Sequence, residues 1–220
     1  MKFKKATYHV QIADMLRNMI MTGKLKEGDK VNEGQLCETM GISKTPMREA
    51  LRVLSVEGLI RLVPNRGAFV TKPEFEEIAE MFDVMSLLEG FCARRACEKM
   101  TSRDFAHLEK LHAKLEENFK QHNQVEYIRI NNLYHSFVQE IAGNRTLNQI
   151  VDGLRKKILL YRFQSLNLPD RFVSSILEHR NLLEAFRQRD YLKAETLMRE
   201  HLQNQTMALE KLVEQSKAAT

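Results

Sequence analysis

Three of the seven histidines stand where their imidazole nitrogens can meet inside a helical protein. His135 follows Asn131 by four residues, so both side chains lie on one face of a predicted helix. His179 and His201 lie on successive predicted helices, at nearly equal distances before and after a turn at residues 189–190. Helical bundles build metal sites from inward side chains at one level. We therefore predict a metal site from these four side chains; the alternative is three separate histidines bonded to backbone or carboxylate groups.

A second group of side chains has the chemistry that DNA binding requires. The hydroxyl and basic side chains at the start of another predicted helix are Ser43, Lys44, Thr45 and Arg48, and Arg52 lies one turn further along the face of Arg48. The N-terminal end of a recognition helix enters the major groove, where a guanidinium can form two hydrogen bonds with guanine. We predict that Arg48 contacts a base, that Lys44 contacts a base or a phosphate, and that the hydroxyls contact phosphates. The alternative is that these charges only solvate a short helix.

The elements that position these cations are expected to be short helices. Apolar residues recur with helical spacing from Tyr8 to Thr22, and Asn32 is a suitable N-cap for a helix from Glu33 to Met40. Gly41 ends that helix, and a further helix carries the cations as far as Gly58. A short helix, a tight turn and a second helix form a helix-turn-helix.

The segment after these helices predicts a β-hairpin. Residues 59–63 and 68–71 are rich in strand formers and flank a turn at 64–67 that contains Gly67. A hairpin in this position is the wing of a winged helix-turn-helix, and Arg66 and Gly67 at its tip are expected to reach the adjacent minor groove. We therefore assign residues 1–72 to a DNA-binding domain, with a linker at the following proline.

The charge distribution agrees with that assignment. Residues 1–72 contain 13 Lys and Arg against 7 Asp and Glu, a net charge of +6, whereas the rest contains 21 against 22, a net charge of −1. The excess positive charge thus lies in the part expected to meet phosphates. A chance asymmetry is the alternative. A non-specific architectural DNA protein would need basic character over more of the chain.

Residues 73–220 predict an all-helical domain. Breaks near residues 101–102, 122–123, 143–144, 167–170 and 189–190 divide this part into about six helices. No repeat or sustained heptad is present, so an antiparallel bundle is favoured over a solenoid or a coiled coil. The expected fold class is mainly α: an N-terminal winged helix-turn-helix plus a C-terminal all-α antiparallel helical bundle.

The rest of the composition indicates a cytoplasmic protein with no membrane partner. No stretch approaches the roughly 18 apolar residues of a membrane span, and the N-terminus lacks a signal peptide. An odd number of cysteines without metal spacing predicts inert core thiols at Cys37, Cys92 and Cys97. The remaining histidines have no partners in the sequence pattern, and we place them at the surface: His9, His107, His112 and His122.

The first third resembles the winged-helix domain of the GntR family of regulators. The segments that carry the resemblance are Gly23-Lys24-Leu25, Gly28, Leu36-Cys37-Glu38, Gly41-Ile42-Ser43-Lys44-Thr45-Pro46-Met47-Arg48-Glu49-Ala50-Leu51, Glu57-Gly58-Leu59 and Arg66-Gly67-Ala68-Phe69-Val70. The resemblance implies that Lys44, Thr45, Arg48 and the wing tip contact an operator. Lys44 stands where the family usually has Arg, which argues against bidentate base contact there.

The second part resembles the FCD effector domain of the FadR subfamily. The segments that carry this resemblance are Leu88-Glu89, Tyr134-His135, Ala142-Gly143-Asn144, Glu178-His179 and Ala194-Glu195-Thr196-Leu197-Met198-Arg199-Glu200-His201. It implies a metal held by three histidines and an Asp, but the Asp position is Asn131 here. Met85 stands where relatives often carry an Arg. The resemblance implies a divalent ion such as Zn or Ni that holds an organic acid, with Met85 beside the pocket. Further candidate pocket groups are Arg129, Arg155, Tyr161 and Arg162, and a solvated surface position is the alternative for each of these four.

Together these features predict a sequence-specific DNA-binding transcription regulator and not an enzyme. We expect a homodimer on a near-palindromic operator, a repressor in preference to an activator, with its operator affinity controlled by a small-molecule effector. The competing hypothesis is a metalloenzyme that uses the histidines to activate water. It lacks a general base, because no Glu flanks a histidine in an HExxH arrangement.

Overall fold

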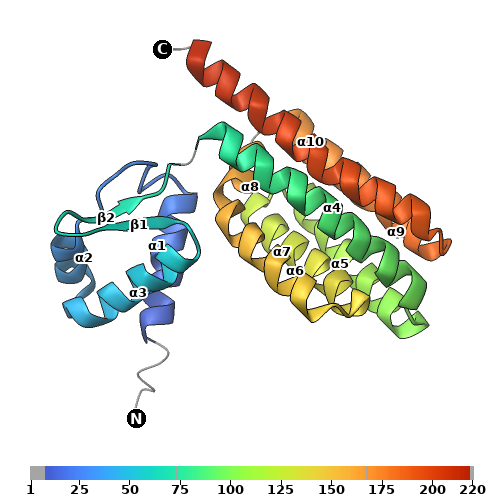
Figure 1. The fold of residues 1–220 in the computed structure, drawn as a ribbon, viewed down its shortest axis with the longest axis horizontal. Coiled ribbons are helices and arrows are strands. Elements are labelled where there is room, and N and C mark those ends of the chain that lie inside the picture. Colours follow the sequence, from blue (N-terminus) through green and yellow to red (C-terminus); the bar gives the residue numbers. More distant parts are fainter. Residues whose placement is uncertain (1–7, 73, 167, 219–220) are drawn as a thin grey trace. The chain divides into compact units, whose positions relative to one another are not determined.

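The computed structural model describes residues 8–72, 74–166 and 168–218, and the chain forms two compact units, Met1–Pro73 and Glu74–Thr220 (Figure 1). The sequence analysis sets its boundary after residue 72. Each unit has its own buried core. They are therefore described separately.

The first unit contains three helices and a two-stranded antiparallel sheet: α1 (Tyr8–Met21), α2 (Glu33–Met40), α3 (Lys44–Val56), β1 (Ile60–Val63) and β2 (Gly67–Val70). In the sheet Ile60 pairs with Val70 and Val63 with Gly67. The helix-turn-helix and wing expected from the sequence are confirmed. The loop before α2 also pairs with β2, through a bridge between Lys30 and Phe69 that no sequence pattern indicates.

Local signals explain where α2 and α3 begin and end. The Asn32 side chain accepts a hydrogen bond from the backbone N–H of Gln35 and so caps α2. Gly41 ends α2 in the left-handed region, at φ 63°, where glycine carries no steric penalty. Ser43 occupies the N-cap position of α3 but makes no side-chain capping bond. Its hydroxyl is therefore not used by the helix.

The helix α3 is held by one apolar face. Met47, Ala50, Leu51 and Leu54 are buried at 1% exposure or less, and α3 packs mainly against α1 and β1. Arg17 of α1 adds a bidentate ion pair to Glu57, just after α3, with Nη2 2.8 Å from both carboxylate oxygens. The opposite face of α3 is consequently fixed in position and free to face a partner.

The second unit is all-helical, which confirms the expected fold class. Its described helices are α4 (Phe75–Lys99), α5 (Ser102–Lys120), α6 (Gln124–Ala142), α7 (Arg145–Lys157), α8 (Leu159–Leu166), α9 (Pro169–Arg187) and α10 (Tyr191–Ala218). In Figure 1, α4 runs alongside α10, and α4 also packs against α6, while α5 packs against α6 and α9.

The prediction of about six helices in this unit was wrong by one. The segment expected as a single helix between residues 144 and 167 is divided at Ile158, where φ is −93° and ψ is 3°. No glycine or proline marks this point. Ile158 is fully buried in one apolar cluster with Met85 and Tyr161, so its packing accompanies a break that helix propensity does not signal.

The other helix ends have local causes. Thr101 and Asp104 form a capping box at the start of α5, and Asn123 and Asn144 cap α6 and α7. Gly143 ends α6 in the left-handed region. These caps fix the registers from which inward side chains project.

The cysteines and the hydropathy of the helices complete the description. Cys37, Cys92 and Cys97 are buried and free, and burial raises the pKa of the Cys92 thiol to about 12. None of the helices that the structure describes combines the length and the hydropathy needed to cross a bilayer.

Candidate nucleic-acid interface and metal centre

The outward face of α3 presents the side chains that the sequence singled out. Ser43, Lys44, Thr45, Arg48 and Arg52 are all exposed. Arg48 is held on one side only, because its Nε lies 3.4 Å from Glu33 Oε2 and 66% of its side chain remains exposed. An exposed pair of this length is a weak restraint. The guanidinium therefore keeps donors available for a base edge.

A hollow of about 490 Å³ separates α3 from the wing. Its lining includes Arg48 and Arg52 from α3, Glu33 from α2, and Asn65 and Gly67 from the wing. Arg66 is exposed at the wing tip, and Gly67 has φ 102°, a conformation that side chains rarely adopt. The two cations that line this hollow, Arg48 and Arg52, both come from α3, and the wing contributes Asn65 and Gly67.

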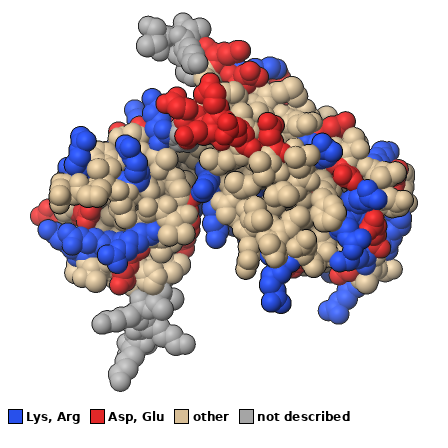
Figure 2. All heavy atoms as spheres, viewed as in Figure 1, with Lys and Arg blue, Asp and Glu red and all other residues tan. Residues whose placement is uncertain are grey.

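The structure adds Lys30 to this surface. Lys30 lines a second hollow of about 540 Å³ together with Asn32, Asn65 and Arg66. The bridge to Phe69 and backbone hydrogen bonds between this loop and β2 bring Lys30 beside the wing, so no spacing in the sequence indicates it. Figure 2 shows Lys and Arg gathered on the visible face of the first unit, whereas the visible acidic side chains gather mainly over the second.

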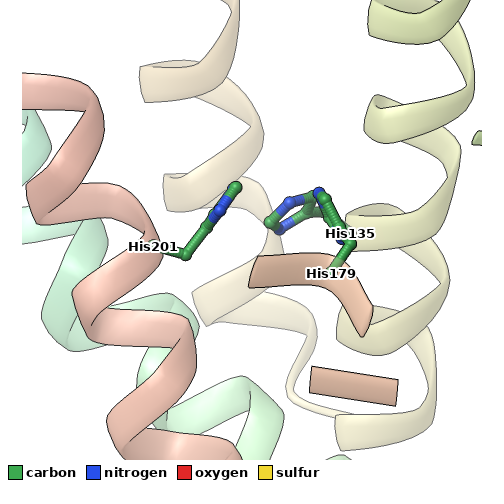
Figure 3. A group of neighbouring side chains, drawn as sticks. All are labelled: His135, His179 and His201. Atoms are coloured by element: carbon green, nitrogen blue, oxygen red, sulfur yellow. The ribbon is translucent and has the colours of Figure 1, made fainter. Parts of the chain in front are cut away.

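The second unit brings three histidines together. His135 from α6, His179 from α9 and His201 from α10 are fully buried, and each offers a ring nitrogen within 4.8 Å of the others (Figure 3). Their ring centroids lie 5.3, 5.2 and 4.8 Å apart in the three pairs. Three separate helices thus direct imidazoles to one point.

Carboxylates behind the cluster orient two of the rings. His135 Nδ1 lies 2.7 Å from Glu89 Oε2, and His201 Nδ1 lies 2.6 Å from Glu178 Oε2. Because a carboxylate accepts hydrogen bonds, each Nδ1–H donates and each Nε2 keeps its lone pair. Both Nε2 atoms are buried without a partner, as are both ring nitrogens of His179. This is the arrangement in which outer carboxylates orient metal-binding histidines.

Burial sets the protonation of the cluster. It lowers the pKa of His135 and of His179 well below the ordinary value, and it lowers that of His201 as well. The rings are therefore neutral near pH 7. Neutral imidazole is the form that binds a divalent ion.

Asn131 lies one turn before His135 on α6. It is 1% exposed, and its Oδ1 is buried without a hydrogen-bond partner. An amide oxygen can serve as a metal ligand but contributes no charge. In donor chemistry, three imidazole nitrogens and an amide oxygen fit a divalent cation such as Zn or Ni.

Four of the five expected pocket residues are buried, Arg155 among them at 7% exposure, and one is not. Met85 and Tyr161 lie in one apolar cluster, at 0% and 7% exposure, and Arg162 is 1% exposed. The expected pocket position of Arg129 is wrong, because 57% of its side chain is exposed and it pairs with Glu126 on the same helix. Arg129 precedes Asn131 by two residues, which turns it about 200° around α6, away from the interior.

Arg155 and Arg162 are joined by a residue that the sequence did not indicate. Asn132 Oδ1 accepts from Nη1 of Arg162 at 2.7 Å and from Nη1 of Arg155 at 3.4 Å. Arg155 also pairs with Glu89. Burial alone would raise the pKa of Glu89, but the charge of Arg155 lowers it well below the ordinary range. Glu89 is therefore ionised.

Beside His201, Arg171 and Glu178 form a bidentate pair, with contacts of 3.0 and 2.7 Å.

The prediction that His112 lies at the surface was wrong. It is 8% exposed, because it lies on the face of α5 that buries Leu108 and Leu115. The apolar spacing of α5 contains the signal, since His112 follows Leu108 by one turn.

Comparisons with known proteins agree over both units. Residues 9–70 match the description "Bacterial regulatory proteins, gntR family", and residues 80–204 match the FCD domain. The chain is 26% identical over 218 residues to YdhC, an HTH-type transcriptional regulator of Bacillus subtilis, which covers 97% of this chain and 96% of the relative. It is also 26% identical over 216 residues to the Glc operon transcriptional activator of Escherichia coli K12, covering 87% and 84% of the two chains.

A third relative is the E. coli K12 repressor RspR, 23% identical over 193 residues, which covers 88% of this chain and 85% of the relative. Among solved structures, E. coli McbR/YncC superposes with a TM-score of 0.78 at 22% identity, covering 94% of this chain and 98% of that chain. A GntR regulator from Rhodococcus gives a TM-score of 0.76 at 16% identity, covering 93% and 98%. These superpositions bear on the fold.

Proposed function

The chain belongs to the GntR family of bacterial DNA-binding transcription regulators and carries an FCD domain, and from that premise we propose that it is a homodimeric repressor. Its affinity for a near-palindromic operator would be set by an organic acid bound beside a metal ion. The observation that carries the proposal is the histidine cluster. It leaves four ring nitrogens buried without partners inside the domain that the family uses for effectors.

The metal part of the proposal rests on the donor set. His135, His179 and His201 would supply three neutral nitrogens, and Asn131 an amide oxygen. Bound there, a divalent ion such as Zn or Ni would supply open positions for the oxygens of an organic acid. Glu89 and Glu178 would hold the rings and keep the proton on the outer nitrogen.

The effector part rests on charge. Arg162 is buried, and two of its guanidinium nitrogens have no partner. A buried cation without a counter-ion is costly, so a carboxylate is the ligand chemistry that such an interior favours.

The DNA part rests on exposure and symmetry. Arg48 and Arg52 on α3 would enter the major groove, with Lys44, Thr45 and Ser43 at the helix start and Arg66-Gly67 at the wing tip. One such module buries too little surface for tight specific binding, so two copies on an inverted repeat are expected. We propose repression because occupancy of a promoter by a dimer blocks polymerase without any further contact.

A hydrolytic enzyme is not favoured. Glu89 is tied to His135 and Arg155, and Glu178 to His201 and Arg171, so neither carboxylate is placed as a free general base. The buried rings and pairs are arranged to hold a ligand.

The test is selection from a random double-stranded DNA library with the purified protein, in Zn²⁺, in Ni²⁺ and in chelator. We expect a short inverted repeat to be enriched, and a reporter driven by a promoter containing that repeat to fall when the chain is expressed. Enrichment in none of the three conditions would overturn operator binding. A reporter that rises would overturn repression.

A further inference from the structure

Arg162 is the buried cation on which the effector part of the proposed function rests. It is 1% exposed, and among the described residues no carboxylate forms an ion pair with it. Its Nη1 donates a hydrogen bond to Asn132 Oδ1, at 2.7 Å, while Nε and Nη2 are buried without partners among the described residues. A guanidinium has five donors, so most of its capacity is unused.

A second guanidinium lies close to the first. Arg155 Nη1 reaches the same Asn132 oxygen at 3.4 Å. Two like charges therefore converge on one neutral amide, and the carboxylate that pairs with either of them is Glu89. The cations exceed the anions on this side of the cluster by one.

The carboxylates that contact the histidines form their ion pairs with arginines other than Arg162. Glu89 pairs with Arg155 as it orients His135, and Glu178 pairs with Arg171 as it orients His201. Each ion pair is neutral as a whole. The net charge of this interior is therefore +1, carried by Arg162.

The identity of residue 131 then sets how much charge a ligand must bring. With neutral rings and the neutral amide of Asn131, a divalent ion would add its full +2, giving +3. An Asp at this position would leave +2. Uncompensated charge in a buried site costs several kcal/mol per ion, so an additional anionic charge is strongly favoured.

We propose that this interior selects an anion with at least two negative charges, such as a dicarboxylate, and that Asn131 and Arg162 together impose this requirement. The inference rests on the proposed function, because its charge balance includes the metal ion. A monocarboxylate would leave +2 behind, whereas a dianion would leave +1.

The test compares two ligands of equal length and unequal charge. The full-length protein is loaded with Zn²⁺, its metal content is measured, and succinate, butyrate and inorganic phosphate are titrated by calorimetry. We expect succinate to bind at least about 10-fold more tightly than butyrate, since a close buried charge pair contributes more than 1 kcal/mol. Phosphate distinguishes an inorganic dianion from a dicarboxylate, and tighter binding of either dianion than of butyrate supports the proposal.

Two variants connect the preference to its residues. Arg162→Met should remove most of the preference for succinate and should raise the melting temperature without anion, because an unpaired buried charge is removed. Asn131→Asp should tighten Zn²⁺ binding and shift the preference toward butyrate by at least about 10-fold. Arg187→Met, at an exposed arginine paired with Glu184 and Glu109, is the matched control and should change neither.

The outcomes separate the two claims. If Zn²⁺ and Ni²⁺ both fail to bind, the proposed metal site is overturned, and so is the charge balance that includes the ion. If the metal binds and butyrate equals or exceeds succinate, the metal site stands and the dianion proposal is overturned. Circular dichroism checks that each variant is folded. If Arg162→Met is unfolded, the binding preference of Asn131→Asp, whose side chain has nearly the same size, tests the dianion proposal.

Discussion

Arg48 shows how one exposed residue can carry specificity. Its neighbours on α3 that face inward are fully buried, so the helix cannot turn to relieve a lost contact. Its own guanidinium is restrained only by a weak pair with Glu33. We therefore expect a change at this position to act on DNA contact with little effect on folding.

Arg48→Ala should weaken binding to the selected operator by about 1–3 kcal/mol and relax preference at one base pair of each half-site. Fluorescence anisotropy with the operator and with a scrambled duplex measures both effects. Arg103→Ala, at an exposed arginine of α5, is the control. An equal loss of binding free energy on the two duplexes would show that Arg48 contacts a phosphate and not a base.

The buried histidines predict how stability depends on pH. Burial lowers the pKa of His135, His179 and His201, so below about pH 6.5 the unfolded chain binds protons that the folded metal-free protein does not. The free energy of unfolding should therefore fall as the pH drops from 7.5 to 5.5. Urea titrations on chelator-treated protein measure it.

His107→Gln, at a histidine exposed on α5, is the control variant for the same measurement. A free energy of unfolding that stays level across this pH range would show that the three rings are not held neutral.

At the scale of elements, the contact between α4 and α10 depends on a glycine. A Cβ added at Gly90 would lie 2.5 Å from Arg199 Cγ and 3.2 Å from the Glu195 carbonyl oxygen. The first contact is with a flexible side chain, whereas the second is with backbone. A side chain added at this point would therefore require both the Arg199 side chain and the backbone of α10 to shift.

Gly90→Ala should lower the free energy of unfolding by about 1–3 kcal/mol, because the backbone of α10 must shift. Gly153→Ala is the matched control: it also lies inside a helix, but nothing stands within 4 Å of the added carbon. Alanine there should stabilise by about 0.5–1 kcal/mol. Urea unfolding of both variants measures the difference, and equal signs would contradict this packing argument.

At the scale of the whole molecule, the charge is distributed as expected if the first unit binds DNA and the second binds a ligand. The first unit carries the excess of positive charge, and the second buries ion pairs around a cluster of neutral rings. We therefore expect phosphate contacts in the first unit and ligand contacts in the second. The proposed dimer doubles both.

Sedimentation equilibrium should give twice the 25.7 kDa mass of one chain, and the stoichiometry on the selected operator should be two chains per inverted repeat. Binding should also weaken steeply with salt, since several phosphates are neutralised per half-site. A repeat without its second half-site is the control duplex. A single chain bound to the full repeat would contradict the dimer.

The sequence by itself determined the local features of this protein. Asn32 and Gly41 act through their own backbone neighbours, as do the caps at Thr101, Asn123 and Asn144, so helix ends could be predicted from residue types. The helix-turn-helix with its wing followed from such signals, and so did the helical character of the second unit.

The tertiary structure alone decided which charges meet. Glu89 pairs with Arg155, 66 positions away in the sequence, and Asn132 contacts Arg162, 30 positions away. The break at Ile158, the outward turn of Arg129 and the burial of His112 likewise depend on packing between helices. Such contacts depend on how helices rotate and pack against one another, which spacing along a single helix does not encode. The charge balance around the three histidines is therefore a property of the folded bundle.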